Sequence, residues 1–81
     1  MPKVQRRNIP QALLEHLVDR VAERNIDAAA LSQLLAWLNT QPEVPDAAWY
    51  KRFPSMTVCG HGSLVKTFLT PHQTALGTEV G

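Results

Sequence analysis

The chain has 81 residues, of which 44% are hydrophobic, and its eight Lys and Arg against seven Asp and Glu leave a formal net charge of +1. A chain this short holds one domain, and its apolar content is too high and its charge too small for a disordered protein. No stretch offers the ~18 consecutive apolar residues of a membrane span, and residues 1–11 lack the apolar core of a secretory signal. The single cysteine excludes an internal disulfide. We therefore expect one cytoplasmic domain over residues 1–81, with no membrane contact.

The first expected element is a basic arm over residues 1–8, followed by a helix that begins near Pro10. The arm carries Lys3, Arg6 and Arg7, and three cations neutralise only a few phosphates, so any nucleic-acid binding through it would be weak. Proline is well tolerated in the first turn of a helix. The apolar residues that follow recur at helical spacing: Leu13, Leu14, Leu17, Val18 and Val21.

A second helix is predicted over residues 28–39, and a short turn would join it to the first as an antiparallel helical hairpin over 9–40. Asp27 is a favoured residue at a helix N-cap. No residue between Asp27 and Glu43 is ionised, although the outward face of a surface helix normally carries charged side chains. We therefore expect the C-terminal segment or another subunit to cover this face. The predicted binding residues are Ala29, Ser32, Gln33, Ala36, Trp37 and Trp49.

Prolines 42 and 45 predict an extended linker over 41–46, because a proline disfavours helix at the residue before it. A short third helix is then expected over 47–52, within a unit of helix and β-hairpin at 47–81. Trp49 and Phe53, four residues apart, would share the face of this helix that packs on the helical pair.

The pattern changes to β after Ser55. Residues 56–59 and 64–69 are predicted strands on either side of a glycine-rich turn at 60–63, and 74–80 offers a third strand. The expected fold is α+β: a two-helix antiparallel hairpin plus a short third helix, packed on a small antiparallel β-hairpin or a three-stranded sheet.

Several kinds of chemistry are disfavoured by the residues present. The possible metal ligands lack the close pairs of a zinc site: His16, Cys59, His61 and His72. Cys59 falls within a strand, where a cysteine commonly acts as a small buried hydrophobe. The glycines at 60 and 62 precede a strand, whereas a dinucleotide-binding loop precedes a helix. The second helix carries no cation to contact DNA. We expect no metal and no cofactor.

One polar cluster remains, and it predicts an alternative function. It gathers around the expected β-hairpin: Tyr50, Arg52, His61, Lys66 and His72. A histidine as acid or base, with cations near the phosphorus, can cleave RNA without metal. The layout over about residues 10–80 resembles the small ribonuclease toxins of bacterial toxin–antitoxin systems, although the first strand of many such toxins is missing. That resemblance implies a metal-independent ribonuclease or RNA-binding protein.

Two functions therefore follow from the sequence. The preferred one is a protein-interaction module without catalytic activity, which binds itself or a protein partner through the uncharged second helix and the aromatic cluster at Trp49. The uncharged helix favours this function, and the net charge of +1 argues against the alternative, because nucleic-acid binders usually carry a marked excess of basic residues.

Overall fold

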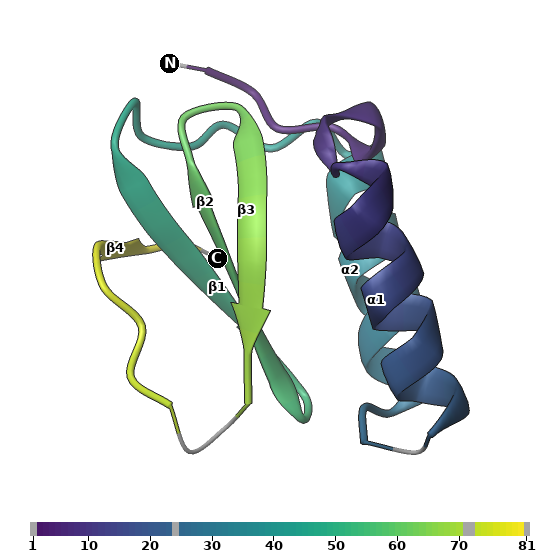
Figure 1. Ribbon diagram of the computed structural model, residues 1–81. Coiled ribbons are helices and arrows are strands. Elements are labelled where there is room, and N and C mark those ends of the chain that lie inside the picture. The colour runs from purple at the N-terminus through teal and green to yellow at the C-terminus, as the bar shows by residue number, and fades with distance from the viewer. Residues whose placement is uncertain (1, 24, 71–72, 81) are drawn as a thin grey trace.

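The structure, a computed structural model, describes residues 2–23, 25–70 and 73–80. These residues form two α-helices and a four-stranded mixed sheet, so the fold is α+β (Figure 1). A short 3-10 helix, η1, spans Arg6–Asn8 and precedes the helices α1 (Gln11–Ala22) and α2 (Ala28–Asn39). The strands are β1 (Ala48–Phe53), β2 (Met56–His61), β3 (Leu64–Leu69) and β4 (Thr78–Glu79).

The two helices lie side by side against one face of the sheet (Figure 1). Their bounds follow the sequence signals: α1 begins directly after Pro10, and α2 covers the predicted range, with Asp27 at its N-cap. The Asp27 side chain makes no capping hydrogen bond; instead its backbone N–H donates to the Ser55 hydroxyl at 3.1 Å. The apolar stripes of both helices reach the core, where Leu17 and Leu34 are fully buried.

The prediction of a third helix over 47–52 is wrong, because Ala48–Phe53 forms the strand β1. Trp49 and Phe53 do share a face, but residues four apart share a face in a strand as well as in a helix. The sequence spacing therefore could not separate the two structures. Pairing with β2 decides between them: Trp49 lies opposite Gly60 and Phe53 opposite Met56 in an antiparallel ladder.

The sheet order is β3-β2-β1-β4, and β4 runs parallel to β1, so the sheet is mixed rather than antiparallel as expected. The expected turn at 60–63 is shorter in the structure. β2 continues to His61, and the chain reverses at Gly62 and Ser63, with Gly62 at φ +58°. Gly60 lies inside the sheet beneath the Trp49 ring, where a Cβ atom would stand 2.6 Å from Cε2 of that ring.

The N-terminal segment, expected to be a basic arm, is joined to the linker that precedes β1. The Val4 N–H donates to the Pro42 carbonyl at 3.1 Å, and the Val44 N–H donates to the Pro2 carbonyl at 2.8 Å. Val4 and Val44 are both fully buried. Lys3 remains exposed, so this segment contributes its valine to the core and a cation to the surface.

The C-terminal segment crosses the sheet on the face away from the helices (Figure 1). This crossing is required by the strand order, because β3 lies at one edge of the sheet and β4 at the other. The Val80 N–H donates to the Tyr50 carbonyl at 2.8 Å and thereby ties the end of the segment to β1. We call residues 73–77, which cross this outer face, the strap.

Candidate functional site

The uncharged outward face of α2 is open to solvent. The exposed residues on this helix are small or polar, and none is ionised: Ala28, Ala29, Ser32, Gln33, Ala36 and Asn39. The sequence left two possible covers for this face, the C-terminal segment and another subunit. Residues 73–77 lie on the opposite side of the sheet (Figure 1), and β4 extends the edge of the sheet, so the described part of the C-terminal segment does not cover α2.

An aromatic cluster of Trp37, Trp49 and Phe53 joins α2 to β1. The Trp37 ring meets Trp49 edge-on at 5.8 Å and Phe53 at 6.1 Å between ring centres. The Lys51 ammonium lies 5.5 Å from the Trp37 ring centre and 5.3 Å from that of Phe53, close enough for cation–π attraction. Trp37 is half-buried beside the exposed face of α2.

Trp49 differs from the other predicted binding residues, because it belongs to the core. Its side chain is fully buried, and its indole N–H donates to the Gly62 carbonyl at 2.8 Å. A buried tryptophan with its N–H satisfied stabilises the fold. Trp49 therefore supports the surface formed by α2 and Trp37 from below.

A second apolar feature lies on α1. A groove of about 460 Å³ is lined by Ile9, Leu14 and Val18, with charges of both signs at its rim from Arg7, Glu15 and Asp19. Half of the Val18 surface is exposed. The helical layer thus presents an uncharged face on α2 and an apolar groove on α1.

The residues of the ribonuclease hypothesis are only partly brought together. Tyr50 and Arg52 alternate with the buried Trp49 on β1, so they face outward, and both line a cleft on the outer face of the sheet. His61 and Lys66 are exposed and do not line this cleft. His72 lies outside the described residues. The ribonuclease hypothesis stays a prediction.

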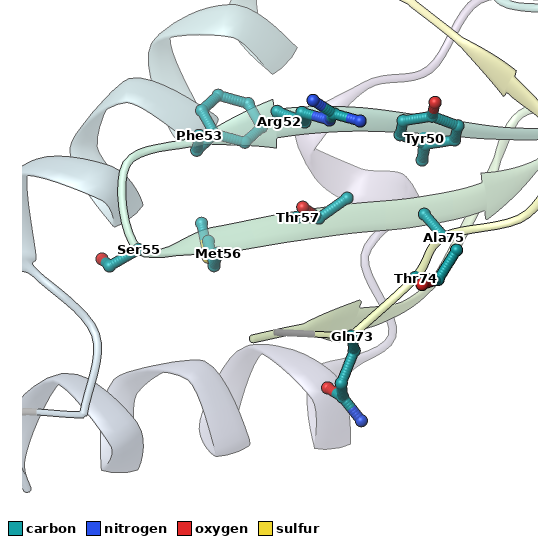
Figure 2. A pocket seen from close by; sticks show the side chains of 9 residues that line it. All are labelled: Tyr50, Arg52, Phe53, Ser55, Met56, Thr57, Gln73, Thr74 and Ala75. Atoms are coloured by element: carbon teal, nitrogen blue, oxygen red, sulfur yellow. The ribbon is translucent and has the colours of Figure 1, made fainter. Parts of the chain in front are cut away.

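The cleft lies between the outer sheet face and the strap, with a volume of about 540 Å³. Figure 2 shows Tyr50 and Arg52 along β1, Thr57 on β2, and Gln73, Thr74 and Ala75 on the strap. The strand register explains which side chains line the cleft from the sheet: Arg52 is paired with Thr57, and both therefore point outward. Arg52 is the charged side chain among those that line the cleft.

Arg52 makes two contacts with neighbouring side chains. Its Nε lies 3.7 Å from a Glu79 carboxylate oxygen, with 70% of the Arg52 side chain and 51% of that of Glu79 exposed. The guanidinium carbon lies 5.8 Å from the centre of the Tyr50 ring. At 3.7 Å, the contact with Glu79 is longer than a hydrogen bond. Its donors remain available for a ligand.

Cys59 also lies on β2, between Val58 and Gly60, and faces outward opposite Tyr50. Burial raises the pKa of the Cys59 thiol. A raised pKa lowers the fraction of reactive thiolate at neutral pH, in keeping with the packing role expected from the sequence. The described residues contain no group of three or more His, Cys, Asp or Glu side chains placed to hold a metal ion.

The sequence singled out Tyr50 and Arg52 but missed the strap side of the cleft. The missed residues are polar or small and follow no periodic pattern: Gln73, Thr74 and Ala75. Their position depends on the crossing from β3 to β4, which no local signal indicates.

Among the described residues, the helices are too short and too polar to cross a membrane.

Comparisons with known protein families, curated proteins and solved structures found no match.

Proposed function

We propose that this protein is a small interaction module without catalytic activity, which pairs with a second copy of itself through the outward face of α2. The observation that carries the proposal is the exposure of a helix face with no ionised side chain, on the side of the sheet away from the C-terminal segment. The open apolar groove on α1, in the same helical layer, adds to the support.

Charge and size favour a second copy as the partner. Two identical faces meet like against like around a two-fold axis, so any charge would oppose its own copy. The α2 face avoids this repulsion because Ser32, Gln33 and Ala36 are neutral. Small side chains also let two helices approach to the short end of the usual 8–10 Å range of interaxial distances. Trp37, at the edge of the face, supplies a large aromatic contact of the kind enriched at interfaces.

The test is the Ala36→Glu variant, measured by size-exclusion chromatography with light scattering. Burial of a carboxylate from each copy without a partner costs about 3–5 kcal/mol, so we expect a dimeric wild-type protein and a monomeric variant. Ala12→Glu is the matched control: Ala12 is an exposed alanine on α1 outside the groove, and this variant should remain a dimer.

Two results would contradict the proposal. One is a monomeric wild-type protein at concentrations of about 100 µM, where even a weak specific dimer forms. The other is equal dissociation by both glutamate variants, because general charge repulsion rather than contact through α2 would then explain it.

A further inference from the structure

The cleft beneath the strap has the features of a small-molecule site that the proposed interaction function does not use. We propose that it binds a free mononucleotide, with the phosphate on Arg52 and the base against Tyr50. The proposal concerns binding alone, and no bond is made or broken. It is independent of pairing through α2, because Tyr50, Arg52 and the strap lie on the opposite side of the sheet (Figure 1).

The size of the cleft suits a ligand of this class. Ligand sites commonly enclose about 300–1,000 Å³, and the volume here is about 540 Å³. The walls combine apolar surface with the hydroxyl groups of Thr57 and Thr74, which can orient a base. Figure 2 shows these polar side chains on both walls, from the sheet and from the strap.

The charge at the cleft selects an anion. Arg52 supplies the positive charge of its lining, and its planar guanidinium can donate two parallel hydrogen bonds to a phosphate. The competing carboxylate of Glu79 approaches only Nε, at 3.7 Å, and both side chains are more than half exposed. Such an exposed pair is weak, so a phosphate in bidentate contact displaces Glu79.

Tyr50 supplies the surface for the base. Its half-buried side chain faces the cleft beside the Arg52 guanidinium, which lies 5.8 Å from the ring centre. Bases stack on aromatic rings and on guanidinium planes. Phosphate and base contacts therefore come from neighbouring residues on one strand face, two positions apart.

The strap is held at both ends, so the cleft exists before a ligand arrives. At one end, the Thr70 N–H donates to Oε1 of Gln73 at 2.9 Å, and the Gln73 N–H donates to the Thr70 carbonyl at 3.1 Å. At the other end, the pairing of β4 with β1 fixes the chain. A preformed site avoids the entropy loss of ordering a loop upon binding.

A mononucleotide fits the charge of the protein better than a long nucleic acid. Polymers need a stripe of cations that contacts several phosphates, whereas the chain has a net charge of +1. Lys66, the exposed cation on β3, does not line the cleft. One guanidinium is enough for one phosphate.

The test is a titration of the ¹⁵N-labelled full chain with AMP, with amide shifts and calorimetry as readouts. We expect shifts confined to residues 50–57 and 73–79, with a Kd on the order of 0.1 mM. Adenosine lacks the phosphate and inorganic phosphate lacks the base, so each should bind at least about tenfold more weakly than AMP.

Three variants test the assigned contacts. Arg52→Gln should raise the Kd for AMP at least about tenfold, because it removes a charged bidentate donor. Glu79→Gln should lower the Kd about two- to threefold, since it removes the competing carboxylate of an exposed pair. Lys66→Gln removes an exposed cation outside the cleft and should leave the Kd unchanged.

The proposal is overturned if AMP causes no shifts in this region, or if Arg52→Gln and Lys66→Gln weaken binding equally, which indicates non-specific attraction. It is also overturned if a short oligoribonucleotide binds at the same residues more than about tenfold tighter than AMP, because contact with several phosphates then dominates. None of these outcomes changes the oligomeric state, so they are separate from the test of the α2 surface.

Discussion

Gly60→Ala should destabilise the protein strongly, because the Trp49 ring lies over this glycine within the sheet. A Cβ atom at position 60 would stand 2.6 Å from Cε2 of the indole and 2.7 Å from the Leu64 carbonyl oxygen. Carbon atoms in contact are normally about 3.5–4.0 Å apart, so the ring has to move by about 1 Å. The Leu64 oxygen belongs to the paired backbone of β3 and cannot give way easily.

The magnitude follows from what holds the ring. Trp49 is fully buried, and its N–H donates to the Gly62 carbonyl at 2.8 Å. Overpacking of a core costs about 1–3 kcal/mol, and weakening the hydrogen bond of a buried donor adds about 1–3 kcal/mol. Replacing glycine by alanine also reduces the conformational entropy of the unfolded chain, which stabilises the protein by about 0.4–1 kcal/mol. We expect a net loss of about 2–4 kcal/mol, a large share of the ~5–15 kcal/mol stability of a typical domain.

Urea unfolding followed by tryptophan fluorescence measures this loss, and a double-mutant cycle assigns it to Trp49. In a Trp49→Leu background, Gly60→Ala should cost at least about 1 kcal/mol less than in the wild-type protein, because no indole lies over the new methyl group and only the contact with the Leu64 carbonyl oxygen remains. All four proteins are compared at one concentration, since the stability of a dimer depends on concentration.

The reasoning is refuted if Gly60→Ala costs less than about 0.5 kcal/mol, or if its cost is the same with and without the indole. Either result would be expected of a glycine in an exposed turn, the position that the sequence pattern assigned to residue 60. The cycle therefore also tests the placement of β1 and β2 against each other.

Two further predictions concern the strap and the thiol. Gly77→Ala should release the strap, because φ at Gly77 is +105° and a Cβ atom there would meet the backbone carbonyl of Ala48. The Val80 N–H, which donates to the Tyr50 carbonyl, should then exchange its hydrogen faster. An unchanged exchange rate would contradict this prediction. Cys59 should react with a disulfide reagent more slowly than in the urea-unfolded chain, because burial raises the pKa of its thiol. The Cys59 thiol therefore holds its proton more tightly in the folded state than in the unfolded state. The free energy of unfolding should then fall as the pH rises above the ordinary thiol pKa of about 8.5. A Cys59→Ala variant should lack the contribution of this thiol to that decrease.

The helices could be predicted because their signals are local. Pro10 precedes α1, Asp27 precedes α2, and the leucines of α2 repeat at helical spacing between these ends. Such signals need no knowledge of distant residues. The chemistry of the α2 face, with no ionised side chain, could likewise be seen in the sequence. Whether that face is open depends on where the C-terminal segment goes, and only the structure shows this.

The sheet was harder to predict because its pairings join distant residues. A short helix was expected over 47–52, with Trp49 and Phe53 on one face, yet Trp49, Tyr50 and Phe53 are also residues typical of strands. The choice between helix and strand depends on the partner β2, and on Gly60 in it, which leaves room for the indole. A glycine that makes room for a ring across the sheet looks in sequence like a glycine that makes a turn.

The charges of the protein are arranged so that its two candidate surfaces differ in kind. The α2 face carries no ionised group and is suited to contact with another neutral surface, where no charge has to lose its water. The outer sheet face carries Arg52 with the exposed Glu79 carboxylate 3.7 Å from its Nε, and the proposed phosphate would replace that carboxylate with a better-aligned acceptor. The helices lie against one face of the sheet (Figure 1), and Arg52 lines the cleft on the other face. The proposed contact between copies through α2 would therefore leave the cleft open, and one protomer could take part in both proposed interactions.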